Sequence, residues 1–102
     1  MLKTNRMALA GVIAKGPIRR QSPAGVSHCH FVLEHKSEQQ EAALPRQVYC
    51  RIPVVISGQG SQTHTQHLAL GSNIEVSGFL AYQTGRNGAG KLVLHADKII
   101  DI

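Results

Sequence analysis

Aromatic residues are scarce in this chain of 102 residues, which has two tyrosines, two phenylalanines and no tryptophan. A binding site that uses such rings has few candidates, so the position of each ring matters. Cysteine is scarce as well, and two cysteines are too few for the disulfide scaffold of a small secreted domain. We therefore expect a cytoplasmic location.

Long hydrophobic runs are also missing. Met7–Ala14 is apolar and follows Lys3 and Arg6, as in a signal peptide, but it has no credible small-residue cleavage site. About 20 apolar residues are needed to cross a bilayer, and no segment approaches that length. We therefore expect no membrane partner and interpret this run as a β-strand.

Acidic residues are outnumbered by basic ones. Six Asp and Glu stand against eleven Lys and Arg, which gives a net charge of +5 and an isoelectric point near 9.7. Such a surplus favours an anionic partner, nucleic acid or a membrane surface, although it can also simply keep a surface soluble. Apolar residues make up 42% of the chain, enough for a core, and the length predicts a single domain over residues 1–102.

Five segments have the alternation and composition of β-strands. Ser61–Leu70 has the length of a short helix, with Ser61 as its cap and Gly71 as its end. The polar stretch Ser37–Pro45 is expected to be an exposed loop. This order predicts an all-β, five-stranded OB-fold barrel with one short helix, and a small open sandwich is the alternative. The predicted strands are Arg6–Lys15, His28–Lys36, Arg46–Ile56, Asn73–Tyr82 and Lys91–Ile100.

Alternation gives the second and third predicted strands one apolar and one polar face. Phe31 falls on the apolar face, so we expect it in the core and not at a binding surface. Cys29 and Cys50 also fall on apolar faces and are predicted to be buried thiols. Pro53 predicts an edge position or a bulge in the third strand. The polar faces carry side chains that would be exposed together: Lys36, Gln47, Tyr49 and Arg51.

Two motifs suggest chemistry, and each fails on its context. Gly85–Lys91 has the GxxxxGK spacing of a phosphate-binding loop, but Leu92 replaces the Ser or Thr that binds magnesium, and a strand follows where a helix is needed. His28 and His30 flank Cys29, but alternation sends the cysteine to the opposite face. Neither paired carboxylates nor an activated nucleophile accompany these residues. We therefore expect no enzyme activity, no cofactor and no metal.

The sequence offers a binding surface instead. Tyr49 is predicted to point outward on the ligand face of an OB barrel, where a nucleobase can stack on it, and an ordinary surface tyrosine is the alternative. Phe79 lies out of phase in the fourth strand, so it would face a partner subunit unless a bulge at Gly78 turns it inward. Basic side chains would flank this face as a track for phosphates: Arg19, Arg20, Arg86 and Lys91.

Several motifs resemble those of a known family, primosomal replication protein N (PriB). The resemblance runs in order through nearly the whole chain, with hardly a shift in spacing. A part of it is also similar to bacterial single-stranded DNA-binding protein, a related OB fold. The motifs are Asn5-Arg6, Gly11, Pro17–Arg20, Ser22–Gly25, Phe31–His35, Tyr49–Val54, Ile56–Gly58, Gly78-Phe79 and Leu94–Ala96.

The resemblance implies a homodimeric OB-fold protein that binds single-stranded DNA without strong sequence preference. In that family the protein helps to assemble the replication-restart primosome, where it contacts the primosomal helicase (primosomal protein N′) and then a later-acting primosomal protein. The resemblance also implies which residues contact DNA. All of them except Arg46 already belong to the surface inferred from alternation and charge. These contacts are Arg20, Lys36, Arg46, Tyr49, Arg86 and Lys91.

Three positions depart from the family's pattern. Tyr49 stands where a tryptophan can be found, Leu44 occupies a position that can be aromatic, and Thr84 replaces a basic residue. We therefore expect DNA binding that is weaker or more salt-sensitive than in the family's best examples. Two other functions stay open at this point: a protein-interaction adaptor with incidental nucleic-acid contact, and an RNA-binding OB fold.

Overall fold

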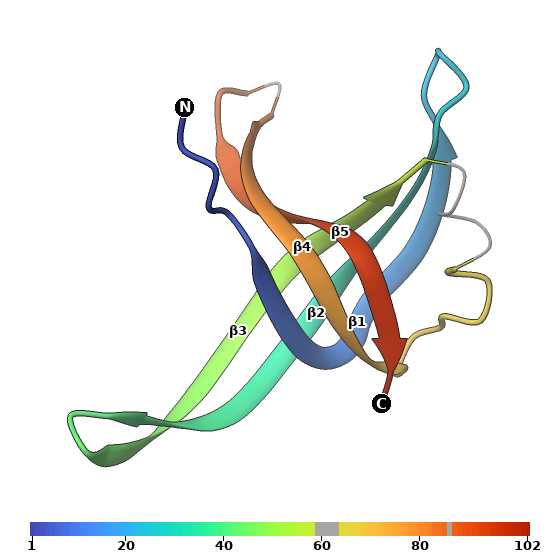
Figure 1. Cartoon of the computed structure of the whole chain (residues 1–102). Coiled ribbons are helices and arrows are strands. Elements are labelled where there is room, and N and C mark those ends of the chain that lie inside the picture. The colour runs from blue at the N-terminus through green and yellow to red at the C-terminus, as the bar shows by residue number, and fades with distance from the viewer. Residues whose placement is uncertain (59–63, 86) are drawn as a thin grey trace.

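The chain folds into a closed barrel of five strands (Figure 1), in a computed structural model that describes residues 1–58, 64–85 and 87–102. Around the barrel the strands follow the order β1-β2-β3-β5-β4, and every neighbouring pair is antiparallel except β3 and β5. The predicted all-β, five-stranded barrel is confirmed. The strands are β1 (Met7–Gln21), β2 (Ser27–Glu41), β3 (Leu44–Ser57), β4 (Asn73–Thr84) and β5 (Gly90–Asp101).

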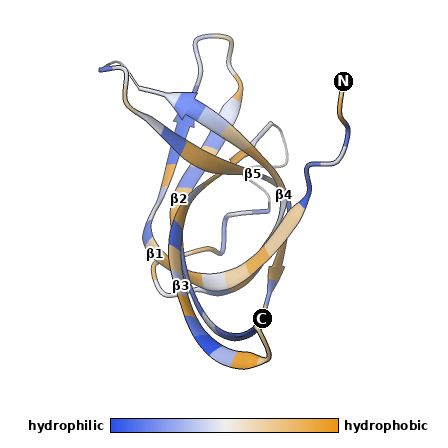
Figure 2. Ribbon diagram, turned by 90° about the vertical axis from the view of Figure 1, so that its left-hand side faces the viewer, coloured by the Kyte–Doolittle hydropathy of each residue, from blue (hydrophilic) through white to orange (hydrophobic). Residues whose placement is uncertain are grey.

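The core lies inside the barrel and is built from alternate residues of every strand. Phe31 is only 3% exposed, as its phase in the strand predicts, and Cys29 beside it is buried. Cys50 is half-buried, because it lies four residues before Val54, where β3 enters the core. Figure 2 shows the strands closing into a ring around this interior. The core consists chiefly of Ile13, Cys29, Phe31, Leu33, Val54, Ile56, Leu68, Ile74, Val76 and Leu94.

β1 is longer than the sequence predicts. It was expected to end at Lys15, but it continues to Gln21, so Arg19 and Arg20 lie on a strand and not in a turn. Irregular pairing with β2 occurs on both sides of Lys15. Such bulges break the alternation of apolar residues, which is why periodicity alone missed the second half of the strand.

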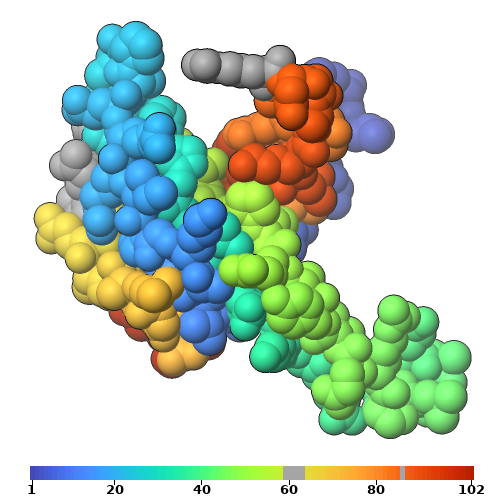
Figure 3. All heavy atoms as spheres, turned by 180° about the vertical axis from the view of Figure 1, so that it is seen from behind, coloured from blue at the N-terminus to red at the C-terminus, as the bar shows by residue number. Residues whose placement is uncertain are grey.

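The stretch expected to be an exposed loop, Ser37–Pro45, is instead the end of a β-hairpin. β2 pairs with β3 without interruption as far as Glu41 and Leu44, which a two-residue turn joins. Ala42 and Ala43 in that turn have φ angles of 53° and 64°. This hairpin extends away from the barrel in Figures 1 and 3. Because it has no buried face, its sequence lacks the alternation that marks a strand.

The helix expected over Ser61–Leu70 is wrong for its described part, since residues 64–70 consist of turns and irregular chain, and residues 61–63 lie outside the described chain. Thr65 and Leu68 are buried, and the Arg19 guanidinium donates a hydrogen bond to the Thr65 carbonyl. Tertiary contacts of this kind fix a short polar segment more effectively than intrinsic helix propensity does. The described residues include no helix long and apolar enough to cross a membrane.

Two further expectations are corrected in part. The bulge at Gly78 is present, but Phe79 stays 43% exposed and stacks on His95 at 5.0 Å between ring centroids. Pro53 produces no bulge, because the pairing of β2 with β3 continues through it. It stands immediately before the point where β5 joins β3, at Val54, so its missing N–H breaks no β3–β5 bond.

Candidate nucleic-acid interface

The outer face of β2 and β3 carries Lys36 and Tyr49 as direct cross-strand partners. Tyr49 is 56% exposed, and the Lys36 Nζ lies 5.9 Å from the centre of its ring. Side chains opposite each other on one face of a sheet are neighbours, so a positive charge and an exposed ring are presented together. The structure thus brings together two of the residues predicted to bind DNA.

A carboxylate holds the Tyr49 ring in place. The Tyr49 hydroxyl donates a hydrogen bond of 3.1 Å to Glu34 Oε2, and the Arg51 Nε lies 3.9 Å from the same oxygen. Desolvation and this hydrogen bond raise the pKa of Tyr49 above its ordinary value. The phenol is therefore neutral at pH 7, and the ring adds no negative charge to a surface that would meet phosphates.

Arg46 lies on the face of the β2–β3 hairpin opposite to that of Lys36 and Tyr49. It pairs with Gln39 and stands three positions from Tyr49, so alternation places the two side chains on opposite faces. Its guanidinium also makes an ion pair of 2.6 Å with Glu41. The structure therefore does not bring Arg46 to the surface that carries Lys36 and Tyr49.

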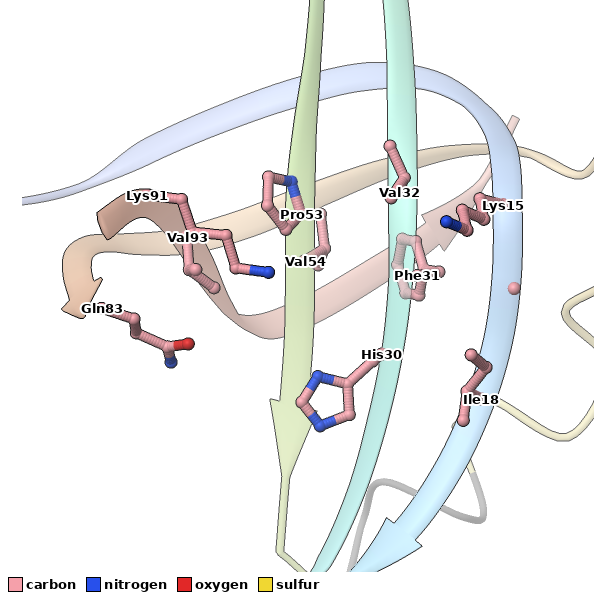
Figure 4. A pocket seen from close by; sticks show the side chains of 11 residues that line it. Lys15, Ile18, His30, Phe31, Val32, Pro53, Val54, Gln83, Lys91 and Val93 are labelled. Atoms are coloured by element: carbon pink, nitrogen blue, oxygen red, sulfur yellow. The ribbon is translucent and has the colours of Figure 1, made fainter. Parts of the chain in front are cut away.

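Arg20 and Lys91 come from different strands and meet near His30. Arg20 lies on β1 opposite His28, and Lys91 lies at the start of β5, where it lines the same hollow as the outward-pointing His30 of β2 (Figure 4). The pKa of His30 is lowered by burial, then by the neighbouring charges of His28, Arg20 and Lys91. His28, Arg20 and Lys91 therefore lie close enough to His30 to disfavour its charged form. Arg86, the sixth residue predicted to contact DNA, lies outside the described residues.

A hollow of about 170 Å³ separates the β4–β5 hairpin from the outer faces of β1, β2 and β3. Figure 4 shows Lys15, His30 and Lys91 around it, with Pro53 and Val93 between them. Sequence reasoning missed Lys15 and His30 as site residues. His30 could have been found, since its phase in the strand places it outward on the same face as Lys36.

The His28–His30 stretch does not form a metal site. Cys29 is buried in the core, whereas the two histidine rings lie together outside, 6.1 Å apart between centroids. Within residues 1–58, 64–85 and 87–102, no three His, Cys, Asp or Glu side chains converge as metal ligands would. The GxxxxGK stretch leads into β5, a strand, so it does not provide the helix N-terminus of a P-loop.

Comparison with known proteins identifies the family. Residues 5–98 match a family described as another single-strand binding protein family. The replication restart protein PriB of Vibrio vulnificus is 71% identical over 99 residues, covering 97% of this chain and 99% of that protein. PriB of Yersinia pestis is 52% identical over 99 residues, covering 97% of this chain and 93% of its own.

Solved structures agree with this assignment. The protein PriB from Ralstonia solanacearum has a TM-score of 0.78 at 26% identity, covering 98% of this chain and 100% of its own. A small single-stranded DNA-binding protein from Streptomyces coelicolor shares the fold, with a TM-score of 0.78 at 18% identity, covering 100% of this chain and 96% of its own. The chain therefore belongs to the PriB family of replication restart proteins, which has the OB fold of single-stranded DNA-binding proteins.

Proposed function

We propose that this protein binds single-stranded DNA without strong sequence preference, as a non-enzymatic part of the cytoplasmic replication-restart primosome. The observation that carries the proposal is the pairing of Lys36 with Tyr49 on an exposed face of the barrel. A cation beside an exposed ring suits a phosphate followed by a base, which are the repeating parts of a single strand. Stacking on a ring requires an unpaired base, so duplex DNA is not expected to bind equally well.

The proposed DNA contacts are those that the resemblance implies. Lys36 and Tyr49 would hold one nucleotide, and Arg20 and Lys91 would continue the track beside His30. Arg46 would reach the strand only where the DNA crosses the tip of the hairpin, because it lies on the opposite face from Tyr49. Arg86 completes the proposed set from outside the described residues.

We further propose a homodimer that forms through β1. Residues 7–11 of β1 pair with β4 on one side, while β2 joins β1 only from Val12 onward. Among the described strands, none pairs with the other side of residues 7–11, where the His35 ring donates a hydrogen bond to the Ala10 carbonyl and residues 7–9 form an open edge. An unpaired edge is a template for a strand of another chain. Two copies related by a two-fold axis could pair these edges with each other. The primosomal helicase and a later-acting primosomal protein are the proposed protein partners.

Titration of a labelled dT oligonucleotide, followed by fluorescence anisotropy over a range of salt concentrations, tests the proposal. The five basic residues of the proposed set predict a log–log salt slope of roughly −3.5 for a single strand, since Tyr49 stacks on a base and neutralises no phosphate. Equal affinity for a duplex competitor, or a slope near zero, would refute single-strand binding. An RNA oligonucleotide of the same length that outcompetes dT would favour an RNA-binding function instead.

Sedimentation of the protein, alone and with the same oligonucleotide, tests the oligomeric state. A monomer at all concentrations would refute the proposed dimer. Tight binding to the helicase without any affinity for dT would favour the protein-interaction adaptor.

A further inference from the structure

The hollow beside His30 is a separate place from the Tyr49 ring. Its wall includes Pro53 of β3, four residues beyond Tyr49 along the same strand. At about 3.3 Å per residue, the two positions are roughly 13 Å apart. A base stacked on Tyr49 therefore cannot also occupy the hollow.

The hollow combines apolar walls with cations. Its walls include the side chains of Ile18, Pro53 and Val93, and Lys15 and Lys91 stand around them (Figure 4). None of its lining residues is an Asp or a Glu. Its volume of about 170 Å³ is well below the roughly 300–1,000 Å³ of sites for drug-sized ligands, so it suits a single planar ring.

We propose that this hollow is a second nucleotide-binding subsite, which takes one base of the bound single strand against Ile18 and Pro53 and its phosphate between Lys15, His30 and Lys91. The inference rests on the proposed single-strand binding and extends it. It assigns DNA contact to Lys15 and His30, which neither the alternation nor the resemblance placed in the site. It also predicts that the bound single-stranded DNA crosses β2 and β3, from the Tyr49 ring to the β4–β5 hairpin.

His30 would couple this subsite to pH. The groups whose charges act on its ring are Arg20 of β1, His28 of β2 and Lys91 of β5. Lys15 of β1 lines the same hollow, to which β3 contributes Pro53 and β4 contributes Gln83. Burial, followed by the positive charges of His28, Arg20 and Lys91, lowers the pKa of His30 in the free protein. A phosphate in the hollow would raise that pKa, because it stabilises the imidazolium.

The sign of the pH effect follows from this shift. If the bound state has the higher pKa, binding takes up a proton, so affinity increases as the pH falls through the bound-state pKa. The increase stops once the pH lies below the lowered pKa of the free protein. We expect dT affinity to rise by about threefold to tenfold between pH 7.5 and pH 5.5.

The first test measures dT affinity at both pH values, at constant ionic strength, for the wild type and His30→Gln. Glutamine preserves a polar side chain but cannot take the proton, so most of the pH-dependent gain should disappear. His64→Gln is the matched control, because exposed His64 lies in the turn before β4 and not in the hollow. An unchanged gain in His30→Gln would overturn the role of His30.

The second test measures the salt slope of Lys15→Gln against that of Lys98→Gln. Both remove one positive charge, but Lys98 lies on β5 opposite Ser77 and does not line the hollow. We expect the Lys15 variant to reduce the slope by about 0.7 and the Lys98 variant to leave it unchanged. Equal slopes for the two variants would overturn the second subsite.

These results separate the inference from the function on which it rests. If the wild type fails to bind dT, the proposed function itself fails. If the wild type binds and Tyr49→Ala weakens it, while Lys15→Gln and His30→Gln behave like their controls, only the second subsite is wrong. Circular dichroism of each variant verifies that the barrel is folded.

Discussion

Lys36 lies directly across the β2–β3 pair from Tyr49, with its ammonium nitrogen 5.9 Å from the centre of the ring. At this separation a cation is attracted to the face of an aromatic ring, by an amount that is small while both groups are exposed to water. The contact therefore contributes little to stability, and its main effect is to position the two side chains for a ligand. It keeps a charge and a stacking surface side by side at the point where a single strand would lie.

Replacing Tyr49 should weaken DNA binding in proportion to the loss of ring surface. Tyr49→Ala removes the platform, so we expect affinity for a dT oligonucleotide to fall by about 5-fold to 150-fold. Tyr49→Trp enlarges the platform and should tighten binding. Anisotropy titrations at one fixed salt concentration measure these changes.

Tyr49→Phe is the matched control, because it preserves the ring and removes only the hydroxyl that donates to Glu34. Its affinity should stay close to that of the wild type. If the alanine variant also binds as the wild type does, Tyr49 is an ordinary surface residue and the stacking role is wrong.

Lys36 and Arg46, two basic residues of the β2–β3 hairpin, should differ in their effect on DNA binding. Lys36→Ala removes a charge beside Tyr49, so we expect the log–log salt slope to become shallower by about 0.7. Arg46→Ala should change it less, because Arg46 is already paired with Glu41 on the opposite face. Titrations over several salt concentrations compare the two variants.

Glu41→Ala provides a check on this difference. It would release Arg46 from its ion pair, and the salt slope should steepen if the freed guanidinium reaches the DNA. A larger effect of Arg46→Ala than of Lys36→Ala would show that the DNA lies on the Arg46 face of the β2–β3 hairpin and not on the Tyr49 face.

The alternation of apolar and polar residues predicted side-chain positions correctly where one side of a strand is buried. It placed Phe31 in the core and Lys36 and Tyr49 outside, and the structure confirms these positions. It failed on residues 37–45, where both faces are exposed and no apolar period exists to be detected. Sequence spacing also gave no reason to join Lys15 to Lys91, since only closure of the barrel brings them to one hollow.

The ion pair between Arg6 and Asp97 should make stability depend on acid. Two hydrogen bonds, of 2.5 and 3.1 Å, join the guanidinium to the carboxylate, and with the charge of Arg6 they lower the pKa of Asp97 below its ordinary value of 3.8. Its contribution is therefore present above pH 3.8 and is lost as the pH falls through the lowered pKa. Both side chains are more than half exposed, so salt should screen the effect.

Asp97→Asn tests this contribution by thermal denaturation at several pH values. The variant should have a lower melting temperature than the wild type at pH 7, and the difference should shrink in acid and at high salt. Asp101→Asn is a control carboxylate on the same strand, whose partner is His67. A difference for Asp97→Asn that is constant from pH 7 to pH 2 would contradict the ion-pair explanation.

The turn of the β2–β3 hairpin holds two alanines in a conformation that favours other residues. Ala42 and Ala43 have φ angles of 53° and 64°, which the two-residue hairpin turn requires and which Asn-Gly adopts more readily. The double substitution A42N/A43G should therefore stabilise the hairpin by about 1 kcal/mol or more. Because the hairpin extends beyond the core, the gain should appear as local protection and not as a large rise in melting temperature.

Amide hydrogen exchange measures that protection residue by residue. We expect amide exchange in residues 37–41, 44 and 46–48 to slow by about tenfold in the double variant, while the core strands keep their rates. Ala24→Gly is the control, since Ala24 lies in the turn between β1 and β2 and its φ angle is not positive. Unchanged exchange in the hairpin would mean that the two alanines add no measurable strain and that the paired strands alone determine how often this hairpin opens.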